Sequence, residues 1–360
     1  MNGSRRNGLL IEALLRPENL VTLSGDRWSD LIREARKADL LGRLGSRLEA
    51  AGMMPQMPEG PRAHLESARV LALAQHVEVR REVQRLRSLL QPLGLPVVLL
   101  KGAAYNCAGL AAAQGRMFSD IDILVPKSGL PAVEATLMLD GWATTHHSAY
   151  DQHYYRKWMH ELPPMQHIQR GTVLDVHHAI LPETARMKPD SAKLLEAIEP
   201  VTGMPGMHVL GPVDMVLHTM VHLFCNEEFS HGLRDLSDID MLLRQFGASP
   251  EFWSRLPLRA EELGLQRPLF YGLRQAQALL ECPVPPSVLE QTRVAAPSAP
   301  VRQLMDHLWQ HVLGAAAQGR RGLFDGGEEF LLLVRAHWLR MPVWLLGFHI
   351  IAKLFRRRDG

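Results

Sequence analysis

Residues 97–125, VVLLKGAAYNCAGLAAAQGRMFSDIDILV, decide the fold that the chain is expected to adopt. Four apolar residues run into Lys101 and Gly102, an alanine-rich segment of helical character follows, and a second apolar run contains Ser-Asp-Ile-Asp. Short apolar runs that are bounded by glycine and polar residues are typical of buried strands. The stretch therefore predicts a strand, a tight turn, a helix and a second strand.

Two carboxylates lie in the second of these strands. Asp120 and Asp122 are separated by one residue. Because side chains alternate across a strand, both are expected on one face, about 7 Å apart at their Cα atoms, while Ile121 and Ile123 point into the core. Such a pair can bind one hard cation jointly, although a merely solvated strand face has the same pattern.

A third carboxylate lies in a later apolar run, residues 172–178, TVLDVHH. Asp175 stands there between Leu and Val, where an unpaired carboxylate is costly. Three strand-borne carboxylates that meet around a divalent metal form a phosphoryl-transfer site. Residues 173, 175 and 177 share a face of this strand, so His177 is expected beside Asp175 and His178 is expected to face away.

These motifs resemble the polymerase β superfamily of nucleotidyltransferases, and more narrowly its bacterial uncharacterised nucleotidyltransferase family. The resemblance is carried by Leu-Lys-Gly at 100–102, Arg116, Ser-Asp-Ile-Asp-Ile-Leu-Val at 119–125, Gly-Trp at 141–142 and Leu-Asp-Val-His at 174–177. The helical flanks match in position as well, so the resemblance covers most of the chain. The superfamily's serine after the turn glycine is Ala103 here, and the interval from Gly102 to Asp120 is longer than usual.

The resemblance implies nucleotidyl transfer from a nucleoside triphosphate to a hydroxyl of a small molecule, peptide or protein, with release of pyrophosphate. It implies that the catalytic and metal-binding residues, which hold Mg²⁺ or Mn²⁺, are Asp120, Asp122 and Asp175. The residues expected to contact the nucleotide are Lys101, Gly102, Arg116 and Ser119. The alternatives are a lysine at a strand end for Lys101 and a surface ion pair for Arg116.

Two other functions stay open at this stage. One is the transfer of another group, such as a sugar from an activated nucleotide, at the same Asp-x-Asp metal site. The other is a non-catalytic, antitoxin-like binding partner that retains the fold, against which the three intact carboxylates argue. Pyrophosphate release would separate the first alternative from nucleotidyl transfer.

The composition indicates which cellular compartment and which binding partners to expect. With 46% apolar and 22% charged residues the chain can bury a globular core, and its 40 basic residues are nearly matched by 38 acidic ones, so nucleic acid is not favoured as a partner. Cys107, Cys225 and Cys282 are too far apart for a disulfide framework or a zinc site, which fits a reducing cytoplasm. Glu12 interrupts the N-terminal apolar run, so no signal peptide is predicted.

The expected fold is α+β: a small mixed β-sheet nucleotidyltransferase core flanked by helical N-terminal and C-terminal regions. Helical periodicity predicts a helical region at 1–93 and another at 191–360, with the core at 94–190. Within the core, further strands are expected at 142–145, 150–158, 165–169 and 173–177, which gives a sheet of about five strands.

Three features outside the core carry weaker expectations. Ser237 to Asp240 repeats Ser-Asp-Ile-Asp within a helical period, where its two acids point about 200° apart and cannot form the same site. His218 and His222 share a helix face without a third ligand, so they are expected near the nucleotide or in the core. The apolar residues 342–355 are too few to span a bilayer and are expected to dock on the protein, with weak membrane-surface contact as the alternative.

Overall fold

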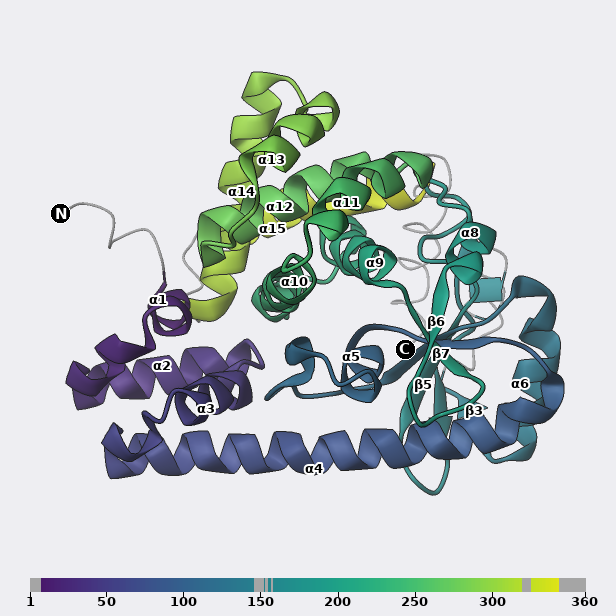
Figure 1. The fold of residues 1–360 in the computed structure, drawn as a ribbon, viewed down its shortest axis with the longest axis horizontal. Helices are drawn as coiled ribbons and strands as arrows, with labels where there is room; N and C mark the ends of the chain where they lie inside the picture. Colours follow the sequence, from purple (N-terminus) through teal and green to yellow (C-terminus); the bar gives the residue numbers. More distant parts are fainter. Residues whose placement is uncertain (1–7, 146–151, 153–154, 157, 319–324, 343–360) are drawn as a thin grey trace, which may run out of the picture.

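The computed structural model describes residues 8–145, 152, 155–156, 158–318 and 325–342 (Figure 1). One mixed sheet is surrounded by helices, which confirms the α+β fold. The helices before the sheet are α1 (Leu9–Leu15), α2 (Gly25–Lys37), α3 (Leu41–Ala50) and α4 (Glu59–Leu90). Those between strands are α5 (Lys101–Cys107), α6 (Leu130–Leu139) and α8 (Ser191–Glu196). Those after the sheet are α9 (Pro212–Cys225), α10 (Gly232–Phe246), α11 (Pro250–Glu262), α12 (Gln266–Leu280), α13 (Pro286–Thr292), α14 (Ala299–Gln318) and α15 (Asp325–Arg340).

The N-terminal helices form because their apolar residues recur every three or four positions. In α2, Trp28, Leu31, Ile32 and Ala35 are buried on one face. The 32-residue helix α4 runs along the bottom of the molecule in Figure 1, below α2 and α3 at one end and near the sheet at the other. It therefore connects the helical N-terminal region to the sheet.

The sheet has seven strands in the order β3-β4-β5-β2-β1-β7-β6. Their bounds are β1 (Val97–Leu99), β2 (Ile121–Leu124), β3 (Trp142–Thr144), β4 (Met165–His167), β5 (Val173–His177), β6 (Ile198–Pro200) and β7 (Met207–Leu210). Strand β2 is antiparallel to β1 and parallel to β5. The carboxyl end of β1 therefore meets the amino ends of β2 and β5, which gathers the predicted site residues at one edge.

Two expectations about strands were wrong. The sheet gains β6 and β7 from the region after residue 190 that was expected to be helical, with β7 pairing parallel to β1. Both strands lie in the interval between the helices α8 and α9, whose helical patterns dominate this part of the sequence, and Pro200 is tolerated because β6 is an edge strand. No strand forms at 150–158 among the described residues, where Gln152, Tyr155, Arg156 and Trp158 are helical.

The C-terminal helices share one hydrophobic core with the rest of the chain. Buried apolar residues from Leu10 to Leu332 form one continuous cluster, so the division into three regions stays a prediction. Across the ranges described above, no helix is both long and apolar enough to cross a membrane. Most of the apolar C-terminal stretch, residues 343–355, lies outside those ranges.

Candidate active site

Two carboxylates lie side by side because β2 and β5 run parallel in register. Asp122 is the backbone partner of Asp175, and Leu124 is the partner of His177 two residues further along. Alternation along both strands therefore brings Asp122, Asp175 and His177 to the same face of the sheet, while Ile123 and Val176 are buried on the other. The alternation of residues in the sequence predicts this shared face for Asp175 and His177, and it predicts that Asp122 and Ile123 point to opposite faces.

Asp122 is held by two cationic groups. The Lys101 Nζ atom lies 2.7 Å from Asp122 Oδ1, and the His177 Nε2 atom lies 3.0 Å from the same oxygen. Lys101 is aimed there by the turn after β1, in which its backbone adopts a left-handed conformation with φ of 46°. Residues other than glycine rarely adopt that backbone conformation, and those that do cluster at functional sites. The turn thus brings an ammonium group to the acids.

Burial and charge act differently on the two neighbouring acids. For Asp122, burial raises the pKa, but Lys101 and His177 outweigh burial and hold the pKa well below its usual value. For Asp175, burial raises the pKa to about 7, and the negative charge of Asp122 adds to that rise. Of the two neighbours, Asp122 is therefore the ionised one at neutral pH, whereas Asp175 is close to half protonated.

The two cations respond to the same acids. Burial lowers the pKa of Lys101, but the negative charges of Asp122 and Asp120 outweigh it and leave the pKa raised. Burial also lowers the pKa of His177, but Glu161 and Asp122 outweigh it, so its pKa is raised as well. The neighbouring acids therefore favour the positively charged forms of both groups in the metal-free protein.

Glu161 is a site residue that the sequence did not predict. Its Oε2 atom lies 3.1 Å from His177 Nδ1, so His177 bridges Glu161 and Asp122. The backbone of Glu161 also forms an isolated antiparallel bridge with that of His177. Neither contact leaves a pattern in the sequence, because Glu161 lies outside the named strands.

Asp120 and Ser119 lie at the margin of this cluster. Asp120 directly precedes β2, is partly exposed, and accepts a hydrogen bond of 2.8 Å from the Ser119 hydroxyl. Its negative charge acts on Lys101 and on Asp175, which places it within electrostatic reach of both. The structure thus puts Asp122 and Asp175 together and Asp120 beside them.

Gly102 and Arg116 pack against each other away from the carboxylate cluster. A Cβ atom on Gly102 would lie 2.3 Å from Arg116 Nη1 and 2.8 Å from the Phe118 ring, so no larger residue fits without displacement. Arg116 Nε donates to Asp238 Oδ2 at 2.9 Å, and Arg43 Nη2 lies 2.7 Å from Asp238 Oδ1. The ion pair considered as the alternative for Arg116 is present, but it is buried. A nucleotide contact by Arg116 stays a prediction.

The second Ser-Asp-Ile-Asp lies on α10, as its helical period predicts. Of its two acids, Asp238 holds Arg43 and Arg116, whereas Asp240 binds Arg244 at 2.8 Å. The two acids therefore serve different partners and form no joint site. The same four-residue motif thus places two acids on one face in the strand, whereas in the helix its acids form structural ion pairs.

His218 and His222 do not act as a pair either. Burial holds the pKa of His218 well below its usual value, so this imidazole is neutral. His222 Nδ1 lies 3.3 Å from Asp235 Oδ2. Within the described part of the chain, the groups that could hold a metal ion contain neither histidine. Zinc binding by this helix face is therefore unsupported.

The carboxylate cluster has the donors of a metal site. Ligand atoms of Asp122, Asp175 and His177 lie within 4.8 Å of one another. Asp175 Oδ1 is buried and has no hydrogen-bond partner, which is costly unless a ligand satisfies it. Carboxylate oxygens suit Mg²⁺ and Mn²⁺, so the residues present fit such an ion. A second group, His160, Glu161 and His177, shares the histidine.

Two cavities border the cluster. One, of about 450 Å³, is lined by Ser119, Asp120, Arg170 and residues of α4. The other, of about 90 Å³, is lined by Lys101 and His177. Ligand pockets are usually 300–1,000 Å³, so the cavity beside Asp120 has the size of a nucleotide site and the one beside Lys101 does not.

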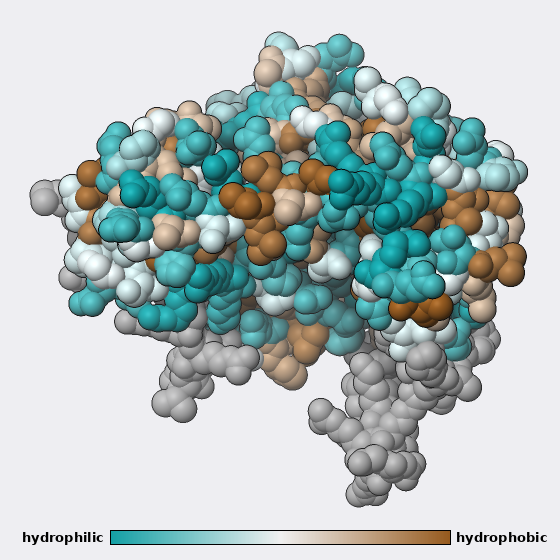
Figure 2. Space-filling model, turned by 90° about the horizontal axis from the view of Figure 1, so that it is seen from below, coloured by the Kyte–Doolittle hydropathy of each residue, from teal (hydrophilic) through white to brown (hydrophobic). Residues whose placement is uncertain are grey.

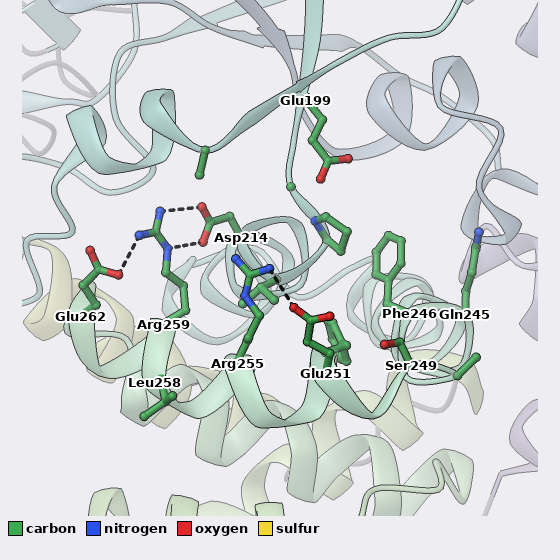
Figure 3. Close-up of a pocket in the computed structure, with 16 residues that line it drawn as sticks. Glu199, Asp214, Gln245, Phe246, Ser249, Glu251, Arg255, Leu258, Arg259 and Glu262 are labelled. Atoms are coloured by element: carbon green, nitrogen blue, oxygen red, sulfur yellow. Dashed lines mark hydrogen bonds and ion pairs between the residues drawn. The ribbon is translucent and has the colours of Figure 1, made fainter.

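A third cavity, of about 680 Å³, lies away from the three predicted carboxylates (Figure 3). Glu199, Asp214, Glu251 and Glu262 line it with two arginines, and Arg259 pairs with Asp214 at 2.8 Å. The remaining arginine, Arg255, approaches Glu251 at 3.8 Å. Four carboxylates against two arginines disfavour a triphosphate there.

The comparison with protein families agrees with this geometry. A family described as "Uncharacterised nucleotidyltransferase" matches residues 24–281, from α2 to the end of α12, which is well over half of the chain. No curated protein and no solved structure matches the chain. The matched range contains the three predicted carboxylates, Lys101 and the whole sheet. The chain therefore belongs to the uncharacterised nucleotidyltransferase family and is a transferase of nucleotidyl groups.

Proposed function

We propose that the protein transfers a nucleoside monophosphate from a nucleoside triphosphate to a hydroxyl of a small molecule, peptide or protein, with Mg²⁺ or Mn²⁺, and releases pyrophosphate. The observation that carries this proposal is the parallel register that sets Asp122 beside Asp175, whose buried Oδ1 has no partner. Lys101 lies next to them, where an ammonium can meet phosphate. The buried cysteines are free thiols, which supports a reducing compartment such as the cytoplasm.

The three carboxylates are proposed to hold the metal, and one of them, Asp175, also accepts the proton of the acceptor hydroxyl. Asp120, Asp122 and Asp175 would hold the metal, which when bound neutralises triphosphate charge. The acceptor hydroxyl oxygen attacks the α-phosphorus, and the bond from that phosphorus to the bridging oxygen breaks, so pyrophosphate leaves. The hydroxyl proton goes to Asp175, whose backbone pairs with that of Asp122 and whose buried Oδ1 has no other hydrogen-bond partner.

The nucleotide is proposed to enter from the Ser119 and Asp120 side. The cavity of about 450 Å³ lies there, and Arg170 is among its lining residues. Lys101 lines the smaller cavity and lies 2.7 Å from Asp122, so its ammonium could also contact a phosphate oxygen of a triphosphate bound at these acids.

The test is label transfer with each nucleoside triphosphate in turn. The protein is incubated with one α-³²P triphosphate, Mg²⁺ or Mn²⁺, and either the small-molecule or the protein fraction of a lysate. We expect label in one fraction and an equal amount of pyrophosphate, both abolished by EDTA, by Asp122→Asn and by Asp175→Asn. The matched control is Asp30→Asn, an exposed aspartate of α2 that pairs with Arg33 and should leave turnover unchanged.

Three outcomes would count against the proposal. Absence of pyrophosphate and of label with every triphosphate and both fractions would remove nucleotidyl transfer to these acceptor classes. Transfer of the sugar from a nucleotide sugar, without release of pyrophosphate, would support the glycosyl alternative at the same acids. Turnover that survives Asp122→Asn would move the site elsewhere.

A further inference from the structure

Helix α4 carries an exposed apolar stripe at its centre. Val70, Leu73 and Val77 are 58%, 51% and 49% exposed, and Ala74 between them is exposed too. Their spacing of three and four residues puts all four on one face. Figure 2 shows a hydrophobic patch near the middle of the face that α4 forms, surrounded by hydrophilic residues. Contiguous patches of this kind mark interaction sites.

The stripe continues in both directions with exposed residues of the same helix face. Ala63 and Glu66 precede it, and Arg81 and Gln84 follow it, and all four are exposed. The midpoint of the stripe falls between Leu73 and Ala74, close to the centre of α4 (Glu59–Leu90). A helix with a central apolar patch and polar ends of opposite charge can match a copy of itself that runs the other way.

We propose that α4 pairs antiparallel with α4 of a second copy of this chain, about a two-fold axis between Leu73 and Ala74. In that register Val70 faces Val77 of the partner subunit, and Glu66 faces Arg81 of the partner subunit. Each pair lies at equal distances from the midpoint, so every contact occurs twice, as an isologous interface requires. The apolar residues meet in the centre and opposite charges meet on both sides.

The charges favour a second copy over other occupants. Glu66 and Arg81 stand at opposite ends of the stripe, so a parallel pairing would set like charges together, whereas the antiparallel pairing sets opposite charges together. Among the described residues of the single chain, Glu66 pairs with Arg62 at 3.9 Å and Arg81 pairs with Glu78 at 2.6 Å, both at the protein surface. Both can exchange these contacts for intermolecular ones, since exposed pairs are weak.

The experiment measures the mass of the full chain by analytical ultracentrifugation over a range of concentrations. We expect a concentration-dependent dimer, which Leu73→Glu weakens at least tenfold in dissociation constant. Leu139→Glu is the control, because Leu139 is 91% exposed at the end of α6 and outside the stripe. A monomer at every concentration, or a dimer that Leu73→Glu leaves unchanged, would overturn the proposal.

Charge exchange tests the register. Glu66→Arg alone and Arg81→Glu alone each set like charges together and should weaken the homodimer. Mixing these two variants should restore a heterodimer, because each mismatched residue of one chain then faces its opposite charge in the other. Failure of the mixture to associate would overturn the antiparallel register. Co-sedimentation of a monomer with anionic vesicles, lost in Leu73→Glu, would assign the stripe to a membrane surface and overturn the proposal.

Discussion

Asp122 and Asp175 are backbone neighbours with opposite electrostatic surroundings. Asp122 has Lys101 and His177 within 3.0 Å of one oxygen, which holds its pKa well below the usual value. Asp175 has the negative charge of Asp122 beside it and a buried oxygen without a partner, and its pKa rises to about 7. In the metal-free site Asp122 is therefore ionised, whereas Asp175 takes up a proton near neutral pH. Acid–base sites use such a difference in pKa between two neighbouring acids.

Asp175→Asn should stabilise the metal-free protein, and the gain should grow with pH. Because the pKa of Asp175 is about 7 in the folded protein against an ordinary carboxyl value of 3.8, folding takes up a proton between these two pH values. The stability that Asp175 contributes is thus full below the unfolded pKa and is lost as pH rises through about 7. One pKa unit is about 1.4 kcal/mol, so we expect a gain of roughly 2 to 4 kcal/mol at pH 8.

Urea unfolding in EDTA at pH 4.5 and pH 8 checks this prediction. The gain should be small at the lower pH and level off above pH 7. Asp30→Asn should show no such trend. An equal gain in stability at both pH values, or a loss of stability at pH 8, would mean that burial and the charge of Asp122 do not raise the pKa of Asp175.

Two substitutions at Lys101 separate its charge from its backbone conformation. Lys101→Ala and Lys101→Gly both remove the ammonium, so each should weaken nucleotide binding about tenfold to a hundredfold, as expected for a charge-assisted contact of about 1.5 to 3 kcal/mol. The glycine variant should be the more stable by about 1 kcal/mol, since glycine adopts a φ of 46° without strain.

Nucleotide titration by calorimetry and urea unfolding measure the two effects. Equal stability of the two variants would show that the left-handed turn stores no strain. Parental nucleotide affinity in both would leave Lys101 as a lysine at a strand end, without a role in binding the triphosphate.

At the scale of elements, the strands and helices with clear periodicity could be predicted from the sequence. β5 falls at the expected residues, and the shared face of Asp122 and Asp175 follows from alternation along two strands. β6 and β7 were not predicted, because β7 is defined by its pairing with β1, a contact between distant parts of the chain that leaves no local pattern.

The side-chain partners within the site were also beyond the sequence. Glu161 reaches His177 from outside the named strands, and Arg116 finds Asp238 across more than a hundred residues. Such pairs depend on how elements pack and leave no local pattern. The three carboxylates, and His177 beside Asp175, were therefore predictable from the sequence, whereas the contacts of Glu161 with His177 and of Asp238 with Arg116 were not.

Asp238→Asn tests the ion pairs that join α10 to the segment before β2. Asp238 and its partners Arg43 and Arg116 have side chains 2%, 1% and 8% exposed. Removing one partner leaves buried charges uncompensated, which costs roughly 3 to 5 kcal/mol. Asp240→Asn, on the same helix, should cost less, because the side chain of its partner Arg244 is 44% exposed. The urea midpoints of Asp238→Asn and Asp240→Asn compare the two losses of stability. Equal losses would contradict the assignment of the buried ion pairs to Asp238.

At the scale of the whole molecule, residues beyond the family match complete the core. The match ends at residue 281, yet Trp309 of α14 is fully buried. Its ring lies 4.8 Å from Phe224 of α9 and 5.6 Å from Phe229, edge to face in both cases. Arg335 of α15 donates to the Phe224 carbonyl at 2.7 Å. The C-terminal helices thus hold α9, whose His222 and Cys225 line the cavity beside Lys101.

Trp309→Ala should therefore destabilise the whole chain, including the sheet. Truncating a buried tryptophan removes aromatic contacts and leaves a cavity, which costs about 3 to 5 kcal/mol. Leu304→Ala is the control on the same helix, since Leu304 is 51% exposed and its loss should stay within about 0.5 kcal/mol. Urea unfolding followed by far-UV circular dichroism should give one transition, shifted in Trp309→Ala alone. A separate early transition, with the main one unmoved, would show instead that α14 is an independent unit and that the region matched by the family is stable without it.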